Sequence, residues 1–142
     1  MLVSGWRPRA VVLVLSSMLL VSCGRGSPIS NPPASTSSSP RVVVTFQVVD
    51  QEFRIELTDP ADIEVARRLL SGEDAPRIPN GIVVRGDPGA NTGYSWHIDP
   101  TSVEFADVAT EVCDGLPSDV EAGLITSDHY CPWQARVIAI TG

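Results

Sequence analysis

An apolar run close to the N-terminus, residues 10–21, decides how much of this chain is left to form a fold. Arg7 and Arg9 precede the run, and a charged region followed by an apolar region of this length is typical of a signal peptide. As a helix the run would be about 18 Å long, well short of the ~30 Å hydrocarbon core of a membrane. We therefore expect residues 1–22 to be a signal peptide and not a spanning helix.

The end of this run resembles the lipobox of bacterial lipoproteins. It reads Leu20-Val21-Ser22-Cys23, with a branched apolar residue three positions before the cysteine and a small residue directly before it. The resemblance implies that Cys23 becomes a lipidated N-terminus carrying palmitate or similar chains, which makes membrane lipid a partner of the protein. Two or more chains anchor stably, because each buried methylene contributes about 0.8 kcal/mol. We expect the chain on the extracytoplasmic face of the cell membrane or outer membrane; an unmodified Cys23 in an ordinary secretory signal is the alternative.

The segment that follows is poor in residues that could build a core. Residues 24–40 contain six Ser, four Pro and two Gly. Such a composition is typical of a flexible spacer. Residues 23–40 are therefore predicted to be the lipidated cysteine and its linker, and residues 41–142 to be one domain.

The predicted domain is strongly acidic. Residues 41–142 hold seven Arg against 17 Asp and Glu, a net charge of −10, and the whole chain has no Lys. A domain of this charge is repelled by a phosphate backbone and by an anionic bilayer surface. Nucleic acid is therefore excluded as an expected partner.

The first half of the domain shows clear periodicity. Residues 41–49 and 53–57 alternate apolar and polar positions, which predicts two strands of an antiparallel hairpin. Asp59 then offers an N-cap, Pro60 fits the first helical position, and Gly72 supplies a stop. The spacing predicts a helix over residues 60–71.

The second half of the domain is irregular, with short elements between Pro- and Gly-rich turns. Both halves together predict an α+β fold. It would be a small two-layer domain of mainly antiparallel sheet, against which the helix at residues 60–71 and a short second helix pack. We expect a turn at residues 79–81, strands at 82–84, 94–98, 103–113 and 134–140, a surface loop at 87–93 and the short helix at 117–122.

Two cysteines remain after lipidation of Cys23. In an extracytoplasmic compartment, Cys113 and Cys131 are best explained as a structural disulfide. A metal site built from these cysteines with His97 and His129 is the alternative, but the spacing offers no paired Cys-x-x-Cys. We therefore predict no metal and no cofactor.

Catalytic and recognition motifs are weak. Residues 87–91 resemble the opening of a calcium loop without its regular acids or its distal Glu, and residues 85–87 spell a short adhesion tripeptide. His97 falls on the strand face opposite Trp96, and no Ser or Cys nucleophile has a recognisable context. We expect no catalytic residues and no enzyme activity.

Four aromatic residues, half of the chain's eight, lie at predicted junctions of loops and strands: Tyr94, Trp96, Tyr130 and Trp133. Core packing would explain them. An aromatic side chain that reaches the surface would instead be an anchor for a partner, because Trp and Tyr dominate interface hot spots.

Four stretches in order along the domain resemble a bacterial secreted-domain family related to the N-terminal domain of a slime-mould calmodulin-binding protein. The resemblance implies a compact α+β domain of unassigned molecular activity, with no catalytic residues to carry over and no transfer of calmodulin binding. The stretches are FRIELTDPADIEVARRLLSG (53–72), YSWHIDP (94–100), EVCDGLPSDVE (111–121) and YCPWQARV (130–137).

A narrower resemblance is to chagasin-like inhibitors of papain-type cysteine proteases. It is carried by Asn-Thr-Gly-Tyr-Ser-Trp at residues 91–96 and by Cys-Pro-Trp at residues 131–133. It implies that Thr92 and Gly93 would enter the protease cleft while Trp133 braces its rim. The family has Arg where Cys131 stands, and it folds as an all-β sandwich.

Together these observations predict a surface-tethered, non-enzymatic binding module, with protease inhibition as the alternative function. Its partner would be an unknown envelope or extracellular protein or ligand. The predicted binding residues are Asn91, Thr92, Gly93, Tyr94, Trp96, Pro132 and Trp133.

Overall fold

The computed structural model describes residues 40–142, which lie within one compact unit of the chain. The predicted signal peptide, the lipidation of Cys23 and nearly all of the linker lie outside the described residues. None of the helices in the described part has the length and apolar character needed to cross a membrane. The elements are β1 (Val42–Val48), β2 (Gln51–Leu57), α1 (Pro60–Ser71), β3 (Ile78–Arg85), β4 (Trp96–Ile98), β5 (Glu104–Ala106), the 3-10 turn η1 (Glu111–Cys113), α2 (Pro117–Glu121), β6 (His129–Tyr130) and β7 (Arg136–Thr141).

The first sheet has the strand order β2-β1-β7, and both pairs are antiparallel. The predicted hairpin is confirmed: β1 and β2 pair from Val48 opposite Gln51 to Val42 opposite Leu57. Their apolar side chains alternate onto one buried face, as the period of two requires.

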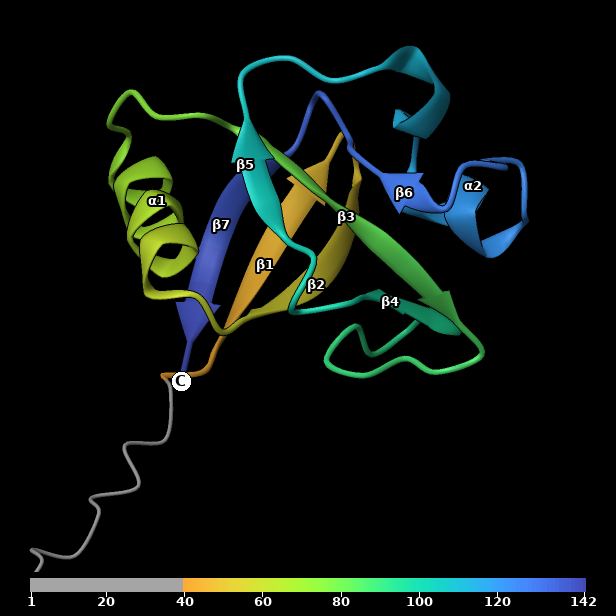
Figure 1. The fold of residues 1–142 in the computed structure, drawn as a ribbon, viewed down its shortest axis with the longest axis horizontal. Helices are drawn as coiled ribbons and strands as arrows, with labels where there is room; N and C mark the ends of the chain where they lie inside the picture. Colours follow the sequence, from red (N-terminus) through yellow and green to blue (C-terminus); the bar gives the residue numbers. More distant parts are fainter. Residues whose placement is uncertain (1–39) are drawn as a thin grey trace, which may run out of the picture. The chain divides into compact units, whose positions relative to one another are not determined.

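The second sheet is organised around β3, which pairs with β4 at its C-terminal end, with β5 at its N-terminal end and with β6 between them. The predicted turn at residues 79–81 is wrong, because these residues lie inside β3. Gly81 is needed for close packing and not for a turn, because a Cβ there would clash with Cγ2 of Ile98. Figure 1 shows β3 crossing in front of β1 and β2.

The predicted long strand at residues 103–113 is also wrong. Strand β5 stops at Ala106, and the chain continues as a loop to η1. Val108 and Val112 in this segment are 83% and 72% exposed. Their apolar character suggested a strand, but within residues 40–142 no neighbouring strand pairs with them.

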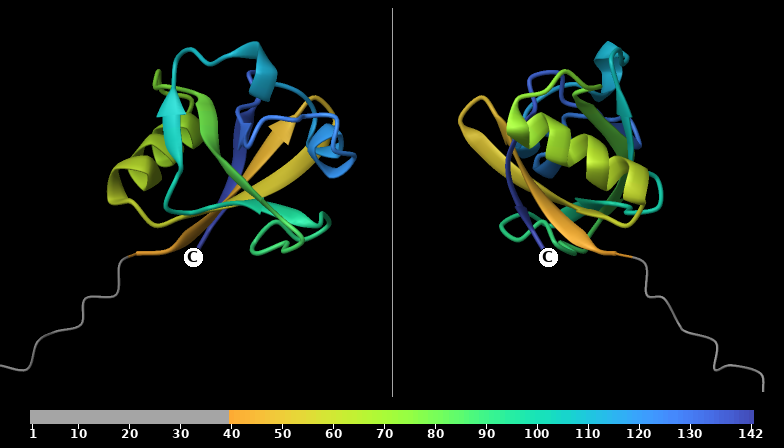
Figure 2. Two further views of the ribbon diagram at one scale, coloured as in Figure 1. Left: turned by 45° about the vertical axis from the view of Figure 1, so that its right-hand side comes forward. Right: turned by 90° about the vertical axis from the view of Figure 1, so that its left-hand side faces the viewer.

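Helix α1 matches its predicted bounds. The Asp59 side chain accepts a hydrogen bond from the Ala61 N–H at 2.7 Å, and Gly72 ends the helix in the left-handed conformation at φ 82°. Ile63 and Ala66 are buried, whereas Leu70, four residues after Ala66, is 45% exposed. Figure 1 and the right-hand view of Figure 2 show α1 packed at the β7 side of the domain.

The core lies between the two sheets and α1, and aromatic rings fill much of it. Phe46 stacks on Phe53 with centroids 5.3 Å apart, and Phe53 and Trp96 both meet Tyr130 edge to face. The predicted short helix is present as α2, whose Val120 is fully buried. The small α+β fold, mainly antiparallel sheet with one longer and one short helix, is thus confirmed.

Candidate functional site

Asn91, a predicted binding residue, is fully buried and has a structural role. Its side-chain oxygen accepts from the Arg54 N–H at 2.9 Å, and its side-chain nitrogen donates to the Trp96 carbonyl at 3.0 Å. The Arg54 N–H points away from β1, so Asn91 ties the outer edge of β2 to β4. This side chain is not available to a partner.

The rest of the loop between β3 and β4 is fixed in place. One guanidinium nitrogen of Arg54 donates to the Thr92 hydroxyl at 3.0 Å and to the Thr92 carbonyl at 3.2 Å. Tyr94 is half-buried against Trp96, whose ring is 1% exposed. Among the predicted residues of this loop, Thr92 and Gly93 are exposed and Tyr94 is partly so, whereas Asn91 and Trp96 are buried.

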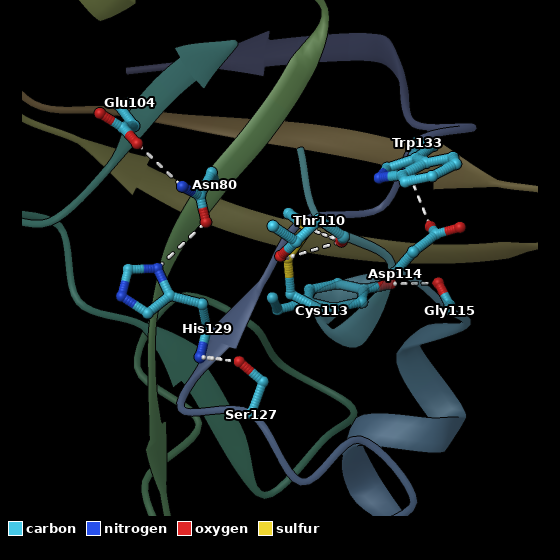
Figure 3. Close-up of a disulfide and its surroundings, with 11 residues drawn as sticks. Asn80, Glu104, Thr110, Cys113, Asp114, Gly115, Ser127, His129 and Trp133 are labelled. Atoms are coloured by element: carbon cyan, nitrogen blue, oxygen red, sulfur yellow. Dashed lines mark hydrogen bonds between the residues drawn. A yellow bond between two sulfur atoms is a disulfide. The ribbon is translucent and has the colours of Figure 1, made fainter. Parts of the chain in front are cut away.

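The other predicted stretch lies beside the disulfide between Cys113 and Cys131, which confirms the predicted pairing. The Cys131 N–H donates to the Cys113 carbonyl at 2.8 Å, and the Trp133 N–H donates to the Asp114 carboxylate at 2.8 Å. Figure 3 shows the surroundings of the disulfide. Pro132 is buried, whereas Trp133 is 39% exposed, so a fixed backbone carries an accessible indole.

Tyr130 adds a further attachment to the same segment. Its hydroxyl donates to the Gly115 carbonyl at 3.0 Å. Burial raises the pKa of this hydroxyl above its ordinary value, so the donating proton is retained at neutral pH. The Tyr130 ring belongs to the core, and it fixes the chain just before Trp133.

A cavity of about 300 Å³ opens beside Trp133. A second cavity of about 330 Å³ shares two lining residues with the first, Val108 and Ala109, and therefore adjoins it along this short segment. We call this region the Trp133 surface and define it by both cavities. The first is lined by Arg77, Ile78, Asp107, Val108, Ala109 and Trp133, and the second by Asn80, Glu104, Ala106, Val108, Ala109, Thr110, Cys113, Ser127 and His129.

The second cavity contains a row of hydrogen-bonded polar side chains. The Asn80 amide nitrogen donates to Glu104 at 2.8 Å, and the Asn80 amide oxygen lies 3.1 Å from Nδ1 of His129. The carboxylate can only accept, which fixes the amide orientation and places a proton on Nδ1 of His129. Figure 3 shows the three side chains in this order.

The structure does not bring the two predicted binding stretches together. The loop carrying Thr92 and Gly93 begins at the Arg85 end of β3, whereas the cavity beside Trp133 includes Ile78, the first residue of β3. Eight residues of strand span roughly 25 Å. Figures 1 and 2 show the β3–β4 loop and the β6–β7 connection at opposite ends of the domain. The single edge that a chagasin-like inhibitor needs is therefore not formed by these residues.

Residues 39–142 match the family model of the BP-74 N-terminal domain. The chain belongs to the BP-74 N-terminal domain family. The match covers the whole described domain and confirms the resemblance to the slime-mould domain that four of its stretches indicated. No curated protein and no solved structure matches this member of the family.

In this family member, residues of the adhesion-like tripeptide and of the calcium-loop-like stretch form structural hydrogen bonds. The Arg85 guanidinium donates to the carbonyls of Val120 and Ile125, which holds the adhesion-like tripeptide against the α2 region. Asp87 accepts from the Gly89 N–H, and its carbonyl meets Nδ1 of His97 at 2.7 Å. Within residues 40–142, no three His, Cys, Asp or Glu side chains gather in a way that could hold a metal ion.

Sequence reasoning missed most residues of the Trp133 surface. Arg77 comes from a segment for which no element was predicted, Asp107 was assigned to the predicted strand at residues 103–113, and Asn80 was assigned to a turn. The available signal was the stretch at residues 107–112, in which exposed valines are flanked by acids and the alternation of a strand breaks down. This member of the family thus has a surface built from residues that lie far apart in the sequence.

Proposed function

We propose that this chain is a lipid-anchored, non-catalytic binding module that takes up a component of the cell envelope at the Trp133 surface. The observation that carries the proposal is an exposed indole beside a cavity, on a backbone fixed by a disulfide and by the Asp114 carboxylate. A Trp on a fixed backbone loses less conformational entropy on binding, so more of its interaction free energy appears as affinity.

The non-catalytic part of the proposal is supported by the two histidines. His97 uses its Nδ1 on a backbone carbonyl, and His129 uses its Nδ1 on Asn80. Among the described residues, neither ring is hydrogen-bonded to a Ser or Cys side chain that could act as a nucleophile. Both rings therefore stabilise local structure or contact a ligand.

Lipid anchoring is supported by the lipobox-like sequence and by the Ser- and Pro-rich spacer that would separate the domain from the headgroups. When the full chain is expressed in a bacterial host, labelled palmitate should be incorporated, and Cys23→Ala should abolish the labelling. The matched control is the double variant Cys113→Ala/Cys131→Ala, which should still be labelled. Labelling that survives Cys23→Ala would disprove the anchoring site.

Binding at the Trp133 surface is tested by co-sedimentation of the full chain with isolated cell envelopes. We expect Trp133→Ala to weaken envelope binding by about tenfold, which corresponds to about 1.4 kcal/mol and is typical of a moderate interface anchor. Leu124→Ala is the matched control, because Leu124 is 72% exposed and lines neither cavity of the Trp133 surface.

Equal loss of envelope binding for the Trp133 and Leu124 variants, or loss for neither, would contradict the proposal.

A titration of the full chain against papain distinguishes the binding module from a protease inhibitor. Occupation of the protease cleft would slow hydrolysis, whereas a module of the proposed kind leaves the rate unchanged. Slowed hydrolysis that depends on Thr92 and Gly93 would replace the proposed function by protease inhibition.

A further inference from the structure

We propose that the Trp133 surface binds a neutral oligosaccharide chain, with one sugar ring in each of its two cavities. This inference rests on the proposed function and adds the chemical class of the ligand. Three observations carry it: the groups that each cavity presents, the way the cavities connect and the charge around them.

The first cavity combines a flat apolar ring with one donor and one acceptor. Arg77 can only donate hydrogen bonds and the Asp107 carboxylate can only accept them. In the described part of the chain, neither forms a hydrogen bond or an ion pair, although both line the cavity with Trp133. A pyranose ring has an apolar C–H face and hydroxyls that both donate and accept, so it matches all three groups.

The second cavity presents further polar groups that are held in position. Because Nδ1 of His129 is bonded to Asn80, Nε2 is left without a partner among the described residues. Thr110 and Ser127, which both carry a hydroxyl, line the same cavity. Hydroxyl groups of a ligand can therefore be bound by fixed donors and acceptors, and the hydrogen bond from Asn80 to the Glu104 carboxylate holds the row in place.

The two cavities connect over Val108 and Ala109, which line both. Val108 is 83% exposed and offers an apolar crossing point between two polar pockets. A ligand that repeats an apolar face with polar edges, ring after ring, fits this alternation. A single sugar would fill one cavity and leave the other empty.

The negative charge around the Trp133 surface favours a neutral oligosaccharide over an anionic one. The domain has a net charge of −10. Asp107 and Glu104 line the cavities, and Glu111 and Asp114 directly follow two lining residues in the chain, against Arg77 as the one Arg in either lining. An anionic polysaccharide would be repelled. A protein partner fits less well, because the cores of protein interfaces are depleted of the charged residues that line these cavities.

The test is calorimetric titration of the full chain, purified in a detergent without a sugar headgroup. The probes are the monosaccharides and hexasaccharides of glucose, xylose, mannose, galactose and N-acetylglucosamine, together with hexagalacturonate as an anionic chain. At least one neutral hexasaccharide should bind, with a Kd about tenfold or more below that of its monosaccharide, because two cavities are filled. Hexagalacturonate should bind more weakly than that neutral chain.

Three variants locate the binding. Trp133→Ala should weaken hexasaccharide binding by about tenfold or more, and Trp133→Phe, which keeps an aromatic platform, should restore most of the affinity. Asn80→Ala releases the His129 ring in the second cavity, so it should weaken hexasaccharide binding more than monosaccharide binding. As a control, Leu124→Ala should alter neither, and the thermal midpoint of each variant reports whether it is folded.

The outcomes separate this inference from the proposed function. If no neutral hexasaccharide binds, or if hexagalacturonate binds best, the oligosaccharide inference is overturned. If envelope binding still depends on Trp133 in that case, the binding module stands and its partner is a protein or an anionic polymer. If envelope binding does not depend on Trp133 either, the proposed function is overturned with it.

Discussion

Replacing Asn91 by Ala is expected to lower the free energy of unfolding by about 2–4 kcal/mol, since a buried polar group left without its partner costs about 1–3 kcal/mol. The variant would leave two such groups, the Arg54 N–H and the Trp96 carbonyl, which now bond to the Asn91 side chain at 2.9 Å and 3.0 Å. Asn91 is 0% exposed, so water does not reach these groups without movement of the loop.

Denaturant unfolding of the full chain measures this loss. Thr92→Ala is the matched control, because it removes a bond from the same loop to Arg54 at an exposed position and should cost less than about 1 kcal/mol. A loss for Asn91→Ala no larger than that of the control would show that Asn91 does not join the two sheets energetically.

Asn91→Asp tests the direction of the two hydrogen bonds. A carboxylate can still accept from the Arg54 N–H, but it would face the Trp96 carbonyl without a proton to donate. Burial and the facing carbonyl raise the pKa of the introduced carboxyl in the folded state. The stability deficit should therefore be smallest below about pH 4, where the group is protonated in both states, and should grow as the pH rises. A deficit that does not change with pH would contradict the assigned donor and acceptor.

Removing the disulfide with Cys113→Ser/Cys131→Ser is expected to cost about 3 kcal/mol of unfolding free energy by the chain-entropy estimate. The two cysteines are 18 residues apart, and the bridge closes the segment that carries α2. Its loss also weakens the support for the hydrogen bonds from Cys131 and Trp133 to the segment at residues 113–114.

The comparison is made by unfolding the oxidised chain, the reduced chain and the double variant. The reduced chain and the double variant should agree, and reductant should not affect the variant. The reduced wild type isolates the contribution of the covalent bond, because its sequence is unchanged. Equal stability of the oxidised and reduced chains would show that the hydrogen bonds alone hold this segment.

Asn91 and the disulfide lie near opposite ends of β3, and their loss has different consequences for binding. The Asn91 contacts join the sheets near Arg85 and leave the Trp133 surface untouched. The disulfide lies directly behind that surface, since Cys113 lines its second cavity. Loss of the disulfide should therefore weaken ligand binding as well as stability, whereas the Asn91 variants should lose stability alone.

Local sequence was sufficient where one element determines its own structure. The alternation in residues 41–57 predicted the hairpin, because side chains on one face of a strand recur every second residue. Asp59, Pro60 and Gly72 predicted the bounds of α1, because capping is a contact between residues a few positions apart. The pairing of Cys113 with Cys131 was predicted from the expected extracytoplasmic compartment and from the lack of another cysteine in the domain.

Local sequence was insufficient where pairing with a distant segment decides the secondary structure. Pro79, Asn80 and Gly81 look like a turn, but strands β5 and β6 pair with them and hold them extended. The apolar residues at 103–113 look like a strand, but in the described domain no strand lies beside them after Ala106.

The same limit applies to the binding residues. Trp96 and Trp133 both lie near a turn and an aromatic neighbour, so local sequence does not show which of the two is buried. Trp96 faces the core because its strand pairs with β3, and Trp133 faces the surface because the disulfide and Asp114 fix the chain just where β6 has ended. The sequence by itself determined the hairpin, the helix and the covalent bridge, whose causes are local or chemical. Only the tertiary structure decided which aromatic ring is exposed and which distant polar groups surround it, because burial depends on packing among segments that are far apart in the chain.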